Sequence, residues 1–161
     1  MSLLSAPGSD EYYMGLALAE AAKETEADDV PIGCVIVDRG RIVGRARNQV
    51  ELLGDATAHA EMIALTQAAA ARGDWRLDGV SLYVTKEPCP MCAGAMLKSR
   101  VSRVVFGAWA PRDGAAGTVI DLLNHPGLGS EIEVLGGIRE PECRHLLQEF
   151  FRRLRRPDPD E

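Results

Sequence analysis

Two cysteines stand three residues apart in the segment TKEPCPMCAG, residues 85–94. A Cys-x-x-Cys pair can bind a metal ion, form a redox disulfide or have no chemical role. Pro88 and Pro90 flank Cys89, and proline is favoured at the first position of a helix, so we expect a helix to begin here. Cys92 then lies on the same helix face as Cys89. Two thiolates at this spacing are typical of half a zinc site.

A second expected helix start supplies a third ligand. The segment TAHAE, residues 57–61, places His59 in the first turn of its helix. Parallel strand–helix units bring their helix starts to the same edge of a sheet, so His59 is expected beside Cys89 and Cys92. A structural zinc ion takes four protein ligands, whereas a catalytic one takes three and leaves a position for water. The sequence therefore predicts one catalytic Zn²⁺ per chain.

Glu61 follows His59 by two residues, which turns it about 200° around a helix. Near a helix end, both side chains can still reach a site that lies beyond that end. A glutamate beside zinc-bound water can take a proton from it and pass that proton to a leaving group. We therefore expect Glu61 to be the catalytic acid and base.

Other interpretations of these residues need weighing. The cysteine pair lacks the context of a thioredoxin-like redox motif. Cys34 lies in an apolar segment and favours a place in the core. A non-enzymatic module with a closed structural zinc remains an alternative, although an intact Glu61 argues against it. That closed site would need a fourth ligand from Cys34, Cys143, His125 or His145.

The hydrophobic pattern divides the chain into alternating helices and strands. Ser9 is expected to cap the first helix, Asp55 or Thr57 the second, and Gly73 to close the second. This order predicts a three-layer α/β/α sandwich with a mixed sheet of about five strands, in which the first hairpin is antiparallel and later strands are parallel. Helices are expected over 9–27, 55–72, 89–100, 119–123 and 141–155, and strands over 32–37, 41–47, 80–85, 101–108 and 130–137.

The composition fits one globular domain over residues 1–161, with 1–8 and 157–161 expected to be flexible. A net charge of −6 argues against a protein covered in nucleic acid but permits a local basic patch. No apolar run is long enough to span a membrane, and the first residues lack the basic and apolar parts of a signal peptide. Four cysteines are too few for a disulfide framework. We therefore expect a cytoplasmic protein without a membrane partner.

His-x-Glu followed by Pro-Cys-x-x-Cys resembles the signature of the zinc nucleoside and nucleobase deaminases. The resemblance extends to the bacterial tRNA-specific adenosine deaminases over residues 12–156. The Gly-Ala-Ala-Gly loop and the Phe-Phe-Arg tail point to this tRNA branch. The segments that carry this resemblance are VPIGCVIV, TAHAEMIAL, LYVTKEPCPMCAGAM, SRVVFGA, DGAAGTVIDLLNHPG and EFFRRLRR.

The resemblance implies a cytidine deaminase-like fold and a hydrolase that converts adenosine to inosine at the tRNA wobble position, as a homodimer. The base must leave its stack to react, which an anticodon loop allows more easily than a duplex. Asn48 would contact the flipped base or its ribose, and Val30, Pro31 and Ala60 would contribute to its pocket. A deaminase of a free nucleobase or nucleoside, of guanine or cytosine type, is the alternative.

The basic residues near the end of the chain bear on this choice. The tail arginines are expected to bind tRNA phosphates with Arg112, although such arginines can also form a solvated helix face. The family usually has an acidic residue where this chain has Ala110, proline where it has Ala56, and leucine where it has Lys86. Trp109 could stack on a base or pack on the protein. The tail arginines are Arg152, Arg153, Arg155 and Arg156.

Overall fold

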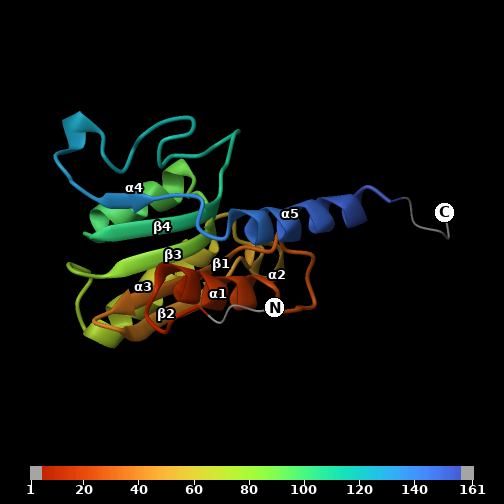
Figure 1. The fold of residues 1–161 in the computed structure, drawn as a ribbon, viewed down its shortest axis with the longest axis horizontal. Helices are drawn as coiled ribbons and strands as arrows, with labels where there is room; N and C mark the ends of the chain where they lie inside the picture. The colour runs from red at the N-terminus through yellow and green to blue at the C-terminus, as the bar shows by residue number, and fades with distance from the viewer. Residues whose placement is uncertain (1–4, 157–161) are drawn as a thin grey trace.

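A computed structural model describes residues 5–156 of the chain. Within this range, five strands form one sheet and helices flank it (Figure 1). The helices are α1 (Asp10–Ala21), α2 (Val50–Leu53), α3 (Ala60–Arg72), α4 (Pro90–Lys98), the 3-10 helix η1 (Pro126–Leu128) and α5 (Glu140–Leu154). The strands are β1 (Gly33–Asp38), β2 (Arg41–Arg47), β3 (Ser81–Lys86), β4 (Arg103–Ala108) and β5 (Glu133–Leu135).

The strands lie in the order β2-β1-β3-β4-β5. Strand β1 is antiparallel to both β2 and β3, whereas β3, β4 and β5 are parallel. Since β2 and β3 are each antiparallel to β1, they run in the same direction on either side of it. Their carboxyl ends therefore reach the same edge of the sheet, where the chain turns toward α3 and α4. The mixed five-stranded sheet expected from the sequence is confirmed.

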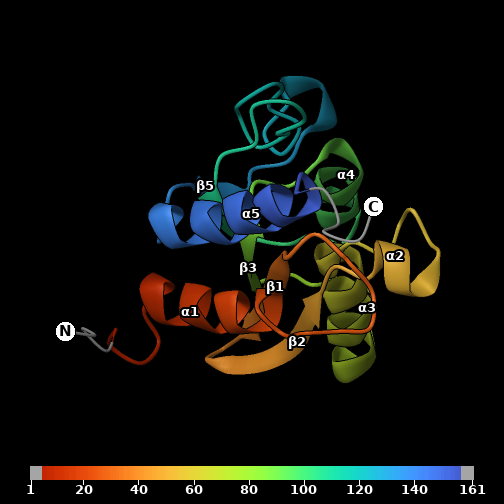
Figure 2. The ribbon, with the colours of Figure 1, turned by 90° about the vertical axis from the view of Figure 1, so that its right-hand side faces the viewer.

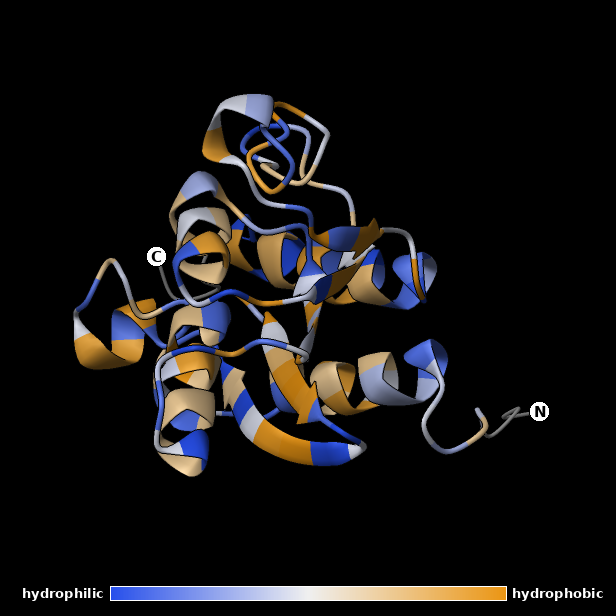
Figure 3. Ribbon diagram, turned by 90° about the vertical axis from the view of Figure 1, so that its left-hand side faces the viewer, coloured by the Kyte–Doolittle hydropathy of each residue, from blue (hydrophilic) through white to orange (hydrophobic). Residues whose placement is uncertain are grey.

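Helices cover both faces of the sheet. Alternate residues of a strand point to opposite faces, so Ile36 and Phe106 pack toward α3 and α4, whereas Val35 and Val105 pack toward α1 and α5. Figure 2 shows α1 and α5 on one side and α3 and α4 on the other. Figure 3 shows mainly hydrophobic colours in the central strands and mixed colours on the helices. This arrangement confirms the three-layer α/β/α sandwich.

A glycine brings α3 close to the sheet. A Cβ atom on Gly44 would lie 2.5 Å from the backbone oxygen of Ala64 in α3, which is closer than such atoms approach. The absence of a side chain on this part of β2 therefore lets the helix that carries Glu61 pack directly on the strand.

Some predicted elements differ from those in the structure. Helix α1 begins after Ser9 as expected, and the Ser9 side chain accepts a hydrogen bond from Tyr12, but the helix ends at Ala21. The expected cap of α3 is wrong, because the residue at the cap is His59. Asp55 and Thr57 instead hydrogen-bond to each other in the preceding turn.

The helix expected over 119–123 is also wrong. The backbone amides of Val119 and Ile120 donate to the carbonyl of Gly114, and that of Leu122 donates to the carbonyl of Ala115. These bonds to an earlier part of the loop replace helical ones. Helix α2, which the sequence pattern did not indicate, appears instead between β2 and α3.

Two further expectations concern the ends of the chain and membrane-spanning helices. Residues 1–4 and 157–161, most of the segments expected to be flexible, lie outside the described residues. The last turns of α5 extend past the rest of the domain in Figure 1. Within residues 5–156, no helix has the length and apolar character needed to cross a membrane.

Candidate active site and metal centre

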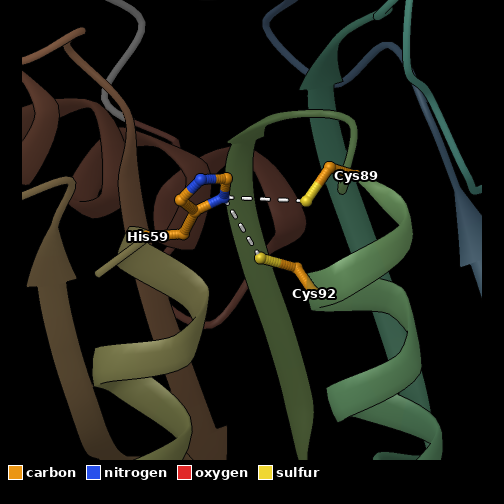
Figure 4. A group of neighbouring side chains, drawn as sticks. All are labelled: His59, Cys89 and Cys92. Atoms are coloured by element: carbon orange, nitrogen blue, oxygen red, sulfur yellow. Dashed lines mark hydrogen bonds between the residues drawn. The ribbon is translucent and has the colours of Figure 1, made fainter. Parts of the chain in front are cut away.

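His59, Cys89 and Cys92 meet at the edge of the sheet where α3 and α4 begin. The Nδ1 atom of His59 lies 3.6 Å from Sγ of Cys89 and 3.4 Å from Sγ of Cys92. Figure 4 shows the imidazole pointing from the start of α3 toward the two sulfur atoms at the start of α4. The three ligand atoms all lie within 4.8 Å of one another, as the sequence predicted.

Local sequence explains why these side chains point off the helix ends. His59 and Cys89 both occupy the N-cap position, with extended backbone, and Pro90 occupies the first turn of α4 as expected. Cys92 lies one turn further along α4 and is buried. Two helix N-termini therefore face the cluster, and their partial positive charges favour thiolates.

The donor set fits a zinc ion. Zinc–nitrogen bonds of about 2.0 Å and zinc–sulfur bonds of about 2.3 Å at a tetrahedral angle separate nitrogen from sulfur by roughly 3.5 Å. The separations between His59 and the two cysteines agree with this value. Within residues 5–156, the cluster has these three members, and no further histidine, cysteine or acidic side chain joins it as a fourth ligand. The arrangement matches a zinc site with three protein ligands, which is the catalytic type.

The residues considered as a fourth ligand lie elsewhere. Cys143 packs with the α1 and α5 layer, on the opposite face of the sheet. The Nδ1 atom of His125 accepts a hydrogen bond from the backbone of Gly127. Cys34 is buried in the core between the sheet and α3. His145 lies on α5 beside α1. The structure therefore does not support a closed structural site.

The two thiols differ in acidity without an ion. A hydrogen bond from Cys92 lowers the pKa of Cys89 to about 4, and the His59 ring contributes to this decrease. The pKa of Cys92 is raised, first because its proton is shared with Cys89 and then because of burial. Zinc binds deprotonated thiols, so binding would release the proton that Cys92 keeps.

Glu61 lies in the first turn of α3, directly beside the cluster. Glu61 is only 4% exposed to solvent. Burial raises the pKa of its carboxyl group, and Cys92 and His59 are polar neighbours of that group. When the pKa of a carboxyl group is raised toward neutral pH, the group can both accept and donate a proton. The position and environment of Glu61 suit the acid–base role predicted for it.

The residues expected around the substrate lie next to this site. The side-chain amide of Asn48 donates to the backbone oxygen of Val30, at 3.2 Å. The next residue, Gln49, bonds through its amide to the carbonyl of Ala58, just before the histidine ligand. Pro31 is partly buried and Ala60 is fully buried. The contacts of Asn48, Val30, Pro31 and Ala60 with a substrate stay predictions.

Asp29 supports this part of the site and was missed by sequence reasoning. Its buried carboxylate accepts hydrogen bonds from the backbone amides of Glu51, at 2.6 Å, and Leu52, at 3.1 Å. It therefore caps α2 from the segment that carries Val30 and Pro31. Asp29 and Glu51 are 22 positions apart, which hides this relationship from any local sequence pattern.

The arginines expected to bind RNA do not form one cluster. Arg112 and Arg155 line a groove of about 700 Å³ between the loop after β4 and α5. Arg153 lines a different cavity, beside the end of α1, and Arg152 forms an ion pair with Glu149. The groove that contains Arg112 and Arg155 is also lined by Lys86, Asp113, Arg144, Leu147, Gln148, Phe151 and Leu154.

The unusual Trp109–Ala110 pair lies at the start of the loop after β4. Ala110 is buried, and its amide donates to Glu87 at 3.0 Å. Trp109 packs edge-on against Phe106, with 4.9 Å between ring centroids, yet remains half-exposed. Glu87 was not singled out from the sequence, although its position immediately before Pro-Cys could have drawn attention to it.

Comparisons with known proteins agree with this geometry. Residues 7–108 match the model of the cytidine and deoxycytidylate deaminase zinc-binding region. The tRNA-specific adenosine deaminase of Bacillus subtilis (strain 168) is 49% identical over 147 residues, or 91% of each chain.

Two solved structures of deaminases are also similar to this chain. One from a study of A-to-I editing by tRNA:A34 deaminases at the wobble position of transfer RNA has a TM-score of 0.80 and 40% identity, covering 84% of this chain and 99% of that one. The guanine deaminase from Nitrosomonas europaea has a TM-score of 0.70 and 28% identity, covering 88% of this chain and 84% of the other. The chain therefore belongs to the zinc-binding cytidine and deoxycytidylate deaminase family and, within it, to the tRNA-specific adenosine deaminases.

Proposed function

We propose that this protein is a zinc-dependent hydrolase that converts adenosine to inosine at the wobble position of tRNA. The observation that carries the proposal is the three-ligand cluster with Glu61 buried beside it, in a chain 49% identical to a tRNA-specific adenosine deaminase. The reaction consumes one water and releases one ammonia, so the site must move protons between them.

His59, Cys89 and Cys92 would hold the zinc ion, which supplies Lewis-acid activation of water when bound. Glu61 would take a proton from the attacking water and deliver it to the amine that leaves C6 of the base. Because burial raises the pKa of Glu61, its carboxyl group can keep that proton between the two transfers. Asn48, held by its bond to Val30, would orient the base or its ribose.

The RNA is proposed to lie along the groove lined by Arg112 and Arg155. The groove presents guanidinium groups for phosphates and the exposed ring of Phe151, on which a base can stack. Lys86 lies in the same groove, three residues before the ligand Cys89. Arg152 and Arg153 are proposed as additional phosphate contacts.

A substrate panel tests the proposal. The purified protein should produce inosine in an anticodon stem-loop with adenosine at the wobble position, and a stem-loop with guanosine there is the control. Turnover of free guanine or cytosine with none of the stem-loop would instead assign the chain to the free-base deaminases, in line with its similarity to a guanine deaminase.

We further propose that the protein acts as a homodimer in the cytoplasm. Leu52 and Leu53 on α2 are exposed apolar side chains that a second copy would cover. Light scattering at micromolar concentration should give twice the monomer mass of 17.4 kDa. A monomer at that concentration would contradict the proposal.

A further inference from the structure

Glu87 is a buried carboxylate that has no part in the proposed reaction. It follows β3, two residues before Cys89, and is 2% exposed. Its oxygens accept four hydrogen bonds from the segment 110–118, called the 110–118 loop below. Oε2 binds the amide of Ala110 (3.0 Å) and the hydroxyl of Thr118 (2.5 Å), and Oε1 binds the amides of Ala116 (3.2 Å) and Thr118 (3.0 Å).

The small residues of the 110–118 loop fit closely around Glu87. A Cβ atom on Gly114 would lie 2.4 Å from Oε2 of Glu87, so only glycine allows so close an approach. Ala115 is fully buried, and its amide donates to the carbonyl of Pro88 at 2.8 Å. Gly117 has φ of +129°, a conformation that glycine adopts readily. The Gly-Ala-Ala-Gly sequence is therefore shaped to close around Glu87.

The 110–118 loop forms one wall of the groove proposed to bind RNA. Arg112 and Asp113 line the groove from this wall, and Arg155 lines it from the end of α5, directly after Leu154. The bonds to Glu87 and Pro88 attach the wall to the two residues that precede Cys89. The position of Arg112 relative to the metal ligands therefore depends on Glu87.

We propose that Glu87 is a positioning residue that fixes the 110–118 loop to the metal-binding segment, so that Arg112 is held where it can bind the RNA substrate. This inference depends on the proposed function, because it requires an RNA substrate. It assigns Glu87 no contact with substrate.

Four donors require a group that only accepts hydrogen bonds. Glutamine has one accepting oxygen and one donating nitrogen. In one orientation its nitrogen would face the amides of Ala116 and Thr118. In the other it would face the amide of Ala110 and the Thr118 hydroxyl, and only the hydroxyl can turn to accept. Either way, at least one backbone amide that now donates to Glu87 loses its acceptor.

The variant Glu87→Gln tests the inference, with Glu131→Gln as a control that removes one exposed acid elsewhere. Glu87→Gln should keep one zinc per chain but speed hydrogen exchange at the amides of residues 110, 116 and 118. The KM for the anticodon stem-loop should rise about tenfold while kcat changes less than about threefold, as expected when a contact that binds substrate and transition state equally is lost. Unchanged exchange, or a fall in kcat at constant KM, would overturn the inference.

Thr118 provides a second test that leaves the carboxylate in place, and it decides the matter if Glu87→Gln does not fold. Thr118→Val should raise KM, as Glu87→Gln does. Thr118→Ser, which keeps the hydroxyl, should have the KM of the wild-type protein. Equal KM values for the two variants would contradict the inference. A wild-type protein inactive on the stem-loop would refute the proposed function instead, while the exchange measurement would still show whether Glu87 holds the loop.

Discussion

The guanidinium of Arg103 binds the carboxylate of Asp10 through two hydrogen bonds, of 2.6 Å and 2.8 Å, although 93 residues separate them. The pair joins the start of β4 to the first turn of α1. The hydroxyl of Tyr83 also donates to Asp10, at 2.9 Å. These bonds tie the α1 layer to the strands that lead to the metal site.

This pair makes stability depend on pH. The hydrogen bond from Arg103 is the main reason that the pKa of Asp10 is lowered. A group with a lowered folded pKa stabilises the protein above its unfolded pKa and loses that contribution as pH falls through the folded value. Asp10→Asn should therefore reduce the free energy of unfolding by about 1 kcal/mol near pH 7, and the difference from wild type should shrink below about pH 4.

Urea denaturation at several pH values measures this difference. Asp28→Asn is the control, because Asp28 is exposed. A deficit of Asp10→Asn that stays constant from pH 7 to pH 3 would show that the charge of Asp10 contributes nothing to it.

Replacing Glu61 should separate metal binding from catalysis. Glu61→Gln keeps the size of the side chain but cannot carry the proton, so turnover of the stem-loop should fall by about 10²–10⁴-fold. Zinc content should stay at one ion per chain, because His59, Cys89 and Cys92 are intact. A variant that holds zinc and reacts at near wild-type rate would refute the role of Glu61.

Removal of a ligand should abolish both zinc binding and activity. Cys92→Ser replaces a soft thiolate with a hydroxyl that zinc binds poorly, so metal content and turnover should fall together. Cys143→Ser is the matched control, since Cys143 is also buried but lies on the opposite face of the sheet. Metal analysis by mass spectrometry distinguishes them. Loss of zinc from Cys143→Ser with retention by Cys92→Ser would place the ion elsewhere.

The sequence predicted most of what depends on local pattern. The strands, the start of α1 at Ser9 and the end of α3 at Gly73 follow from periodicity and capping residues close to each element. The metal cluster could be predicted too, because His-x-Glu and Pro-Cys-x-x-Cys each mark a helix start, and two strands running in one direction bring those starts together.

Features that depend on distant partners could not be predicted. Helix α2 is capped by Asp29, which lies 22 positions before Glu51 in that helix. A helix was expected over 119–123, but backbone amides of this segment bond to Gly114 and Ala115 in a loop that Glu87 holds. The arginines near the end of the chain looked alike in sequence, yet the geometry of α5 directs Arg153 and Arg155 into different cavities.

That separation gives the last prediction. If phosphates lie in the groove between the 110–118 loop and α5, replacing Arg112 and Arg155 by alanine should weaken stem-loop binding and make its salt dependence shallower. Each lost phosphate contact on a single strand reduces the slope of log K against log salt by about 0.7. Arg41→Ala removes an exposed arginine at the start of β2 and should leave that slope unchanged. Fluorescence anisotropy at several salt concentrations measures the slope, and an unaltered value in the Arg112→Ala/Arg155→Ala protein would mean that the RNA follows another surface.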